Sequence, residues 1–525
     1  MSDNRIPMHP PTRRMNVRAS MPLVIALLVS VLPLATIAAA EPCLEAPTEG
    51  GDWPVIHHDT SSTGFQDQEH TISPDNVGQL EPVWAAPLSG STSVSVTADG
   101  GCVFAGGTNV RAFDIDTGDL VWESDEGVGT GYEPSAANGR VFVQSNEMVW
   151  ALDQSTGQIL WEVDAREIQP HGIAAGGSPL PFEDYVVVGF TGCGEGGAGR
   201  TENPGCRGYY AILDQATGAV VVDGYDVSDA DVERGMEGAG FWGRPGYDPE
   251  DKYIYFGEAG PRSIKPQNPY ADAMLQIDAD PDSPTFGEIV NFFRDTRLHQ
   301  LDNSPLPACG RDDVYQDIEN AFVSVCLDDD DFVTTPVIFR DSSGRKLLGM
   351  NHSQSPLPVR NYNDWVVPWG YFFAVDPDTM QEIWRAPATG GRGTLHAYDG
   401  ERLYYSSGHE GGIFAVDKDS GTIVWRSDSL GGNTWMHVTA ANGVVYALSG
   451  NRAVIAGNPG VLLAFDAETG APLLARPLSP DIAAVATGVL GGGITIARNT
   501  VLVPTGAAGA SSGAGGYVVA YRLPS

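Results

Sequence analysis

Three stretches of the sequence hold residues whose types could do chemistry. Glu195 and Glu202 lie in a glycine-rich stretch, GFTGCGEGGAGRTENPGCRGYY, and a carboxylate in such a loop suits a hard cation such as calcium. Asp329 lies in a run of four aspartates that leads into an apolar segment, CLDDDDFVTTPVIF. Trp242, in FWGRPGYDP, is followed by a turn rich in glycine and proline. The simpler interpretations are solvated loops for the acidic stretches and core packing for the tryptophan.

Most common catalytic motifs are absent from the sequence. It contains no HExxH and no P-loop. It also lacks CxxC and CxxCH, which argues against a thiol redox site, a zinc cage and covalently attached haem. The formal net charge of -37 makes a nucleic acid or an anionic membrane an improbable partner, because phosphate groups would be repelled.

The N-terminus has the pattern of a secretory signal peptide. Arg13, Arg14 and Arg18 precede an apolar run over residues 21–40 that ends in three alanines. A transmembrane anchor is the alternative interpretation, but the two prolines in the run and its small-residue end favour cleavage. We therefore expect a signal peptide over residues 1–40, a linker over 41–51, a folded domain over 52–525, and a secreted or periplasmic protein without a membrane span.

Six cysteines lie after the expected cleavage site. An even number in an exported chain predicts disulfides, although the sequence alone leaves 15 connectivities open. Proximity in the sequence favours the pairs Cys193–Cys206 and Cys309–Cys326, which leaves Cys43 for Cys102.

An eleven-residue motif recurs along the chain and defines its organisation. AFDIDTGDLVW (112–122) returns as ALDQSTGQILW (151–161) and AVDKDSGTIVW (415–425), with looser copies that begin at residues 211, 374 and 464. The DxxTG segment predicts a turn in which Asp and Thr side chains bond the backbone and Gly supplies a positive φ, and the tryptophan then packs between sheets. Short strand-like runs separated by turn residues surround each copy, which predicts an all-β protein.

The motif spacing predicts an eight-bladed β-propeller of four-stranded antiparallel blades. The shortest intervals between motif aspartates are 39 and 41 residues, close to the length of one bare blade. Seven outer strands are expected at Trp122, Trp161, Val222, residues 286–294, Trp384, Trp425 and Leu474. The C-terminal YVVAYRLPS starts an eighth copy that LEPVW, ending at Trp84, completes, so the first and last strands close the ring.

The motif set resembles the tryptophan-docking repeats of the pyrroloquinoline quinone (PQQ) dehydrogenases. The opening DWPVIHHDTSSTGF and SPDNVGQLEPVW resemble the start of their propellers, particularly in the polyvinyl-alcohol-dehydrogenase-like branch. The resemblance covers residues 52–523 and implies an alcohol or polyol dehydrogenase that uses PQQ and calcium. Because no haem attachment motif is present, it implies a separate electron acceptor such as a cytochrome or a quinone.

The resemblance also implies roles for individual residues. Trp242 matches the tryptophan that lies under the quinone, and Glu195 matches a calcium ligand, with Glu202 as a competing candidate. Asp329 matches the base that accepts the alcohol proton, and Asp331 is then a turn or supporting residue. Arg207, in the CxxRG-like element, and His352, in GMNHSQ, match cofactor-binding positions. His57 and His58 match a turn of the entry loop, where a structural role is expected.

Several departures from the family pattern favour a second hypothesis, a non-catalytic propeller that acts as a binding or assembly scaffold in the cell envelope. Gly260 replaces a calcium-binding Asn, and His352 replaces a Lys or Arg. The family's vicinal cysteine pair is spread over Cys193 and Cys206. The retention of Trp242, Glu195 and Asp329 together favours the dehydrogenase.

Overall fold

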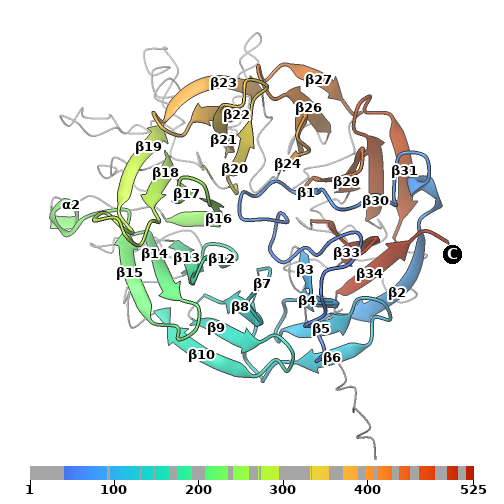
Figure 1. The fold of residues 1–525 in the computed structure, drawn as a ribbon, viewed down its shortest axis with the longest axis horizontal. Coiled ribbons are helices and arrows are strands. Elements are labelled where there is room, and N and C mark those ends of the chain that lie inside the picture. Colours follow the sequence, from blue (N-terminus) through green and yellow to red (C-terminus); the bar gives the residue numbers. More distant parts are fainter. Residues whose placement is uncertain are drawn as a thin grey trace, which may run out of the picture. The chain divides into compact units, whose positions relative to one another are not determined.

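The computed structural model forms a closed ring of eight small sheets within residues 41–525 (Figure 1). Residues 1–40, which include the predicted signal peptide, form a separate unit that lies outside the described residues. The structure describes residues 41–524 except for 91–94, 131, 147, 166–173, 192–206, 234–239, 259–269, 271–272, 295–331, 333, 354–369, 388–395, 407–411, 429–436, 450–459, 479–492 and 506–515.

Each blade has four antiparallel strands, the first of which lies nearest the axis of the ring, and the short strands β11 (Ala174–Ala175) and β1 (Phe65–Gln66) add to blades three and seven. The first four blades contain β3 (Val96–Asp99), β4 (Cys102–Ala105), β5 (Arg111–Asp114) and β6 (Leu120–Glu123); β7 (Ser135–Ala137), β8 (Arg140–Gln144), β9 (Met148–Asp153) and β10 (Ile159–Asp164); β12 (Leu180–Phe182) with β11 (Ala174–Ala175), β13 (Tyr185–Thr191), β14 (Tyr209–Asp214) and β15 (Val220–Tyr225); and β16 (Phe241–Asp248), β17 (Tyr253–Glu258), β18 (Ala273–Asp278) and β19 (Ile289–Arg294).

The remaining blades follow the same order and include the closure of the ring. Blades five to seven contain β20 (Val337–Arg340), β21 (Lys346–Ser353), β22 (Gly370–Asp376) and β23 (Gln381–Pro387); β24 (Ala397–Tyr398), β25 (Arg402–Ser406), β26 (Ile413–Asp417) and β27 (Ile423–Arg426); and β28 (Thr439–Ala441), β29 (Val444–Ser449), β30 (Val461–Asp466) and β31 (Pro472–Pro477). Blade eight joins β32 (Thr495–Ala497), β33 (Thr500–Thr505) and β34 (Tyr517–Arg522) to β2 (Glu81–Pro87).

The predicted closure is confirmed by the pairing of β2 with β34. Trp84, from the start of the described ring, pairs with Ala520, near its end, in an antiparallel register. Eight blades and all eight expected outer strands are therefore as the motif spacing predicts. Among the described residues the helices are short, namely η1 (Val77–Gln79) and α2 (Asp229–Glu233), and none is long and apolar enough to cross a membrane.

The repeated motif joins neighbouring blades at five of the eight boundaries. The Nε1–H of Trp122 donates to the carbonyl of Gln154, the residue after the motif aspartate of the following blade, at 2.9 Å. A Cβ added to Gly157 of that blade's turn would lie 2.4 Å from the Trp122 ring, so glycine makes room for the indole as well as supplying the positive φ of 71°. The same pair of contacts recurs at Trp84 with Gly118, Trp161 with Gly218, Trp384 with Gly421, and Trp425 with Gly470.

Blade four lacks this tryptophan but keeps its hydrogen bond. Asn291 of β19 pairs with Gln276 of β18, at the register that tryptophan and alanine occupy in the regular blades. The Gln276 side chain donates to the carbonyl of Pro377 at 3.1 Å, and Pro377 follows the motif aspartate of blade five. The turn of blade five, which receives no indole, has Met380 where the other turns have glycine.

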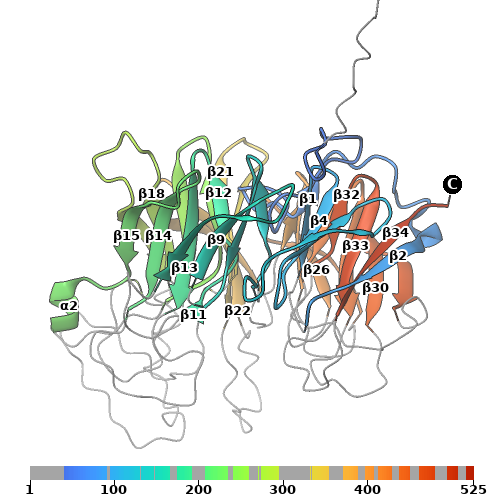
Figure 2. The ribbon, with the colours of Figure 1, turned by 90° about the horizontal axis from the view of Figure 1, so that it is seen from below.

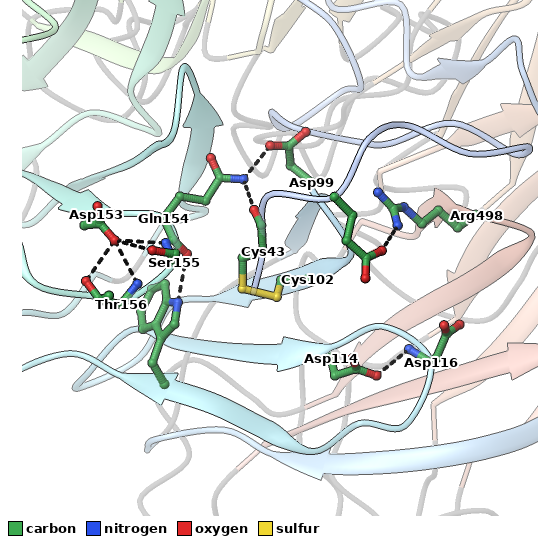
Figure 3. Close-up of a disulfide and its surroundings, with 12 residues drawn as sticks. Cys43, Asp99, Cys102, Asp114, Asp116, Asp153, Gln154, Ser155, Thr156 and Arg498 are labelled. Atoms are coloured by element: carbon green, nitrogen blue, oxygen red, sulfur yellow. Dashed lines mark hydrogen bonds and ion pairs between the residues drawn. A yellow bond between two sulfur atoms is a disulfide. The ribbon is translucent and has the colours of Figure 1, made fainter. Parts of the chain in front are cut away.

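A disulfide joins Cys43 to Cys102 and confirms the pairing expected for these two cysteines (Figure 3). Together with ion pairs from Arg498 to Glu45 and to Asp52, it holds residues 43–51 of the predicted linker (41–51) against the ring. Gln154 adds a hydrogen bond to the Cys43 carbonyl at 2.8 Å. The four other cysteines lie outside the described residues.

Replacing Gly157 with alanine tests the docking contact. A positive φ costs a residue with a Cβ about 1–2 kcal/mol, and overlap with the Trp122 ring adds about 1–3 kcal/mol of overpacking. Gly400→Ala is the matched control, because Gly400 also has a positive φ but a Cβ there would meet no atom within 4 Å. We expect the unfolding midpoint in urea to fall further for Gly157→Ala than for Gly400→Ala. Equal midpoints would show that the indole does not require glycine beneath it.

Candidate functional site

The N-terminal segment over residues 51–66, here called the axial segment, closes one end of the ring's axis. Its backbone carbonyls or amides bond inner strands or the residues that directly follow them in seven of the eight blades. Examples are the Pro54 carbonyl with the amide of Ala136, the Thr60 carbonyl with Tyr247, and the Gly64 carbonyl with Ala440. In Figure 1 the segment runs as the blue trace across the centre of the ring to β1 (Phe65–Gln66).

The axial segment holds an uncommon backbone shape at its centre. His57, His58 and Ser62 have φ values of 63°, 74° and 59°, which side chains with a Cβ rarely adopt. The hydrogen bonds to the surrounding blades offset this cost, since strained residues persist only where the structure around them fixes them. The His57 ring is held inside the protein with 4% of its surface exposed.

Buried polar side chains from the inner strands surround His57. Five of them lie three residues before the amide that the axial segment bonds, so equivalent positions of different blades converge on the axis: Ser95, Glu133, Arg244, Thr335 and His437. His396 and Ser178 join them from blades six and three. Ring centroids separate His57 from His437 by 5.7 Å and from His396 by 6.1 Å. We call His57, Glu133, Arg244, His396 and His437, with the serines beside them, the axial cluster.

Arg244 is the buried cation of the axial cluster. Its Nη2 donates to the carbonyl of Asp59 at 2.9 Å and to the hydroxyl of Ser62 at 2.6 Å, which anchors it to the axial segment. Burial lowers the pKa of Arg244 to about 9, although the charges of Asp59 and Glu133 partly oppose that change. The guanidinium stays protonated at neutral pH.

The acidic and imidazole groups of the axial cluster are also shifted by burial. Burial raises the pKa of Glu133 to about 7, against hydrogen bonds that include the Ser178 hydroxyl, which donates to its Oε2 at 2.7 Å. Burial lowers the pKa of His396 and that of His437 to about 3, and the pKa of His57 falls for the same reason and because of the neighbouring imidazoles and Arg244. The three imidazoles are therefore neutral at pH 7.

Several residues predicted from the sequence lie outside the described residues, namely Glu195, Glu202, Asp329, Asp331 and Gly260. Within the described ranges no group of three or more His, Cys, Asp and Glu could hold a metal ion. The calcium ligand and the base therefore remain predictions.

Three further predicted residues lie in described strands or beside them. Trp242 is on β16, the inner strand of blade four, two residues before Arg244, and its backbone pairs with Gly257. His352 is buried on β21, the second strand of blade five, with its ring 4.7 Å from that of Phe332. Arg207 precedes β14, and its described contacts are outward, over the Tyr225 ring at 4.8 Å and to Asp229 of α2.

The sequence analysis did not identify the axial cluster. His57 was expected to be a structural residue of the entry loop, and it does lie in that loop, but its ring also reaches the axis. Glu133, Arg244, His396 and His437 match no short motif, because they come from four blades and only the ring closure brings them together. Their one shared signal is a polar residue shortly before an inner strand or, for Arg244, within it, where the repeat predicts no function.

The architecture and the repeat place the chain among known propellers. A family model described as "Outer membrane protein assembly factor BamB" matches residues 76–235 and 370–520, more than half of the chain. The chain belongs to this family of PQQ-repeat propellers. The match spans the regular blades on both sides of the enlarged region between them.

Curated relatives carry names from quinoprotein chemistry. The quinohemoprotein alcohol dehydrogenase ADH-IIG of Pseudomonas putida is 28% identical over 294 residues, which are 46% of this chain and 38% of that protein. Subunit 1 of the methanol dehydrogenase [cytochrome c] of Methylorubrum extorquens is 24% identical over 306 residues, 47% of either chain. The chain thus matches less than half the length of these relatives.

A solved structure shares the fold over nearly the whole chain. The quinohemoprotein alcohol dehydrogenase of Comamonas testosteroni aligns with a TM-score of 0.65 and 17% identity, covering 91% of this chain and 82% of that one. At this identity the likeness establishes the eight-bladed architecture alone.

The raised pKa of Glu133 predicts how the stability of the protein depends on pH. The folded protein holds this proton between about pH 4.5 and 7, whereas the unfolded chain has released it, so rising pH over this range destabilises the fold. Glu133→Gln removes this loss. The unfolding free energy of the variant minus that of the parent is expected to increase from pH 5 to 8 by on the order of 2–3 kcal/mol.

Urea unfolding at each pH measures this difference, and the titration of the histidines cancels in it because both proteins contain them. Glu126→Gln, at an exposed carboxylate, is the control and is expected to leave the difference flat. A flat difference for Glu133→Gln as well would show that Glu133 is ionised in the folded protein throughout this range.

Proposed function

We propose that the protein is an exported quinoprotein-type oxidoreductase that oxidises an alcohol or polyol with PQQ and calcium. The observation that carries the proposal is the sequence similarity to quinohemoprotein alcohol and methanol dehydrogenases. The location of Trp242 on an inner strand supports it, since the resemblance implies that this residue lies under the quinone. The Cys43–Cys102 disulfide supports export, because disulfides persist in oxidising compartments.

The described part of the axis fits an anionic, oxygen-rich cofactor. The residues in and beside the inner strands include buried hydroxyls, neutral imidazoles and the Arg244 cation. The axis therefore has hydrogen-bond donors and a positive charge, whereas an apolar core would reject an anionic cofactor. When bound, PQQ would supply a quinone that accepts the hydride of the alcohol, and with it both electrons.

In this proposal the chain's own residues position the reactants and remove the proton. Trp242 supports the plane of the cofactor, and Arg207 and His352 contact its polar edge. Glu195 is a ligand of calcium, with an oxygen donor of the kind that this cation prefers. Asp329 accepts the hydroxyl proton of the alcohol as general base. The electrons then pass to a separate acceptor, a cytochrome or a quinone.

A second function has its own support. The matched family model carries the description of an assembly factor, and Gly260 offers no side-chain oxygen where the resemblance implies a calcium ligand. A propeller that scaffolds an assembly in the cell envelope would need neither cofactor nor base. The two functions differ in one property, the binding of PQQ.

Titration of PQQ and calcium into the cofactor-free protein tests the proposal. We expect saturable quinone absorbance at micromolar PQQ, and reduction of an artificial dye when an alcohol is added. Trp242→Ala is expected to weaken PQQ binding, because stacking on the indole is lost. The absence of PQQ binding by the parent protein would instead support the scaffold.

Asp329→Asn tests the assignment of the base. Loss of a general base typically lowers the rate by about 10²–10⁴-fold, so turnover should fall by that factor while the quinone remains bound. Asp330→Asn makes the same charge change one residue away and is expected to keep turnover near that of the parent. If the two variants behave alike, the role does not belong to Asp329.

A further inference from the structure

The axial cluster contains polar nitrogens that the described protein does not satisfy. Arg244 uses both hydrogens of Nη2 on the axial segment, but its Nε and Nη1 have no hydrogen-bond partner. Neither ring nitrogen of His57 or His396 has a well-aligned partner, although backbone groups of Ser62 and Thr335 approach them. These side chains are at most 4% exposed, so bulk water does not supply the missing bonds.

Unsatisfied buried donors are costly, and they are concentrated here around one charge. A buried polar group without a partner costs about 1–3 kcal/mol, and an unpaired buried cation costs more. Arg244 presents three N–H groups, and each neutral imidazole can present one more. A carboxylate has two oxygens with about four lone-pair sites, so a single small ion can accept from the guanidinium and an imidazole together.

We propose that the axial cluster is a binding site for a small carboxylate anion, held by Arg244 with His57 and His396. Arg244 lies on β16 two residues after Trp242, and the site lies between the inner strands and the axial segment. It does not depend on the dehydrogenase proposal, because its donors belong to the described residues and are present in a scaffold equally. Two sources have this chemistry, a free carboxylate and a carboxyl group of a bound cofactor.

The groups that face Arg244 set a pH dependence for the site. Asp59 of the axial segment and Glu133 of blade two are the acids that act on it, while His57, His396 and His437 are neutral. Protonated Glu133 leaves the Arg244 charge available for the anion. As the pH rises through about 7, Glu133 ionises and competes, so carboxylate affinity falls.

Calorimetric titration of the cofactor-free protein with sodium formate tests the proposal, with sodium chloride at the same ionic strength as the reference. We expect saturable binding at pH 6, weakened at pH 8, and a raised thermal midpoint. Arg244→Gln should weaken formate binding at least tenfold, a loss of about 1.4 kcal/mol. Arg340→Gln, which removes a partly exposed arginine paired with Glu250, is the control and should bind as the parent does.

Two further variants keep the test decisive if Arg244→Gln fails to fold. Glu133→Gln should bind formate with an affinity that no longer falls between pH 6 and 8, which a purely structural role would not produce. His396→Phe keeps a ring of similar shape but removes the donor, and it should weaken binding. Absence of formate binding by the parent protein, or equal stabilisation by chloride, would overturn the proposal.

Repetition of the formate titration with saturating PQQ and calcium identifies the source. If formate still binds, the natural ligand is a free carboxylate in a site of its own. If PQQ abolishes formate binding in the parent and in the Arg340→Gln control alike, the carboxyl group of the cofactor occupies the site. Either result retains the carboxylate chemistry of Arg244.

Discussion

The contact between one blade's tryptophan and the next blade's turn is the constraint on which the rest of the structure depends. The indole of Trp122 must find both a free carbonyl, at Gln154, and a residue without a Cβ, at Gly157. The contact recurs at five of the eight blade boundaries, from Trp84, Trp122, Trp161, Trp384 and Trp425, and at each of them it fixes the angle between neighbouring sheets. At blade four the tryptophan is gone, yet Gln276 still donates to the equivalent carbonyl of Pro377.

The axial segment places polar residues at the centre of the ring. Inner strands have one edge without a neighbouring strand, and unpaired backbone groups at a buried edge are costly. Residues 51–66 bond some of them in seven blades, and the N-terminal trace that contains the segment is drawn in blue beside β1 in Figure 2. The Cys43–Cys102 disulfide and the Arg498 ion pairs fix the chain that leads into the segment (Figure 3). The same segment brings His57, Asp59 and Ser62 to the axis. One segment therefore both closes the end of the ring and contributes residues to the axial cluster.

The sequence predicted the fold far better than the axial cluster, for a physical reason. A motif such as DTGDLVW fixes a turn and a docking contact through neighbours within eleven residues, and its repetition fixes the blade count. Even the split blade, with Trp84 paired to Ala520, follows from an incomplete copy at each end. Six blades separate His57 from His437 in the sequence, and the two rings come together only because the axial segment and blade seven meet at the axis, so no local pattern records that contact. The predicted Glu195 and Asp329 came from a family resemblance, which named no residue of the axial cluster except His57, and that only as a structural residue.

The position of Arg244 also bears on how an acidic protein can hold an anion. The chain has a formal charge of -37, which opposes the approach of any anion. Surface charges are screened within about 8 Å at physiological salt, whereas Arg244 acts in a buried setting where its field is screened far less. The buried donors around Arg244 therefore determine the affinity for an anion, and the surface charge affects mainly its association rate. An anion that enters exchanges water for three guanidinium N–H groups fixed in place by Asp59 and Ser62, so little ordering is required when it binds.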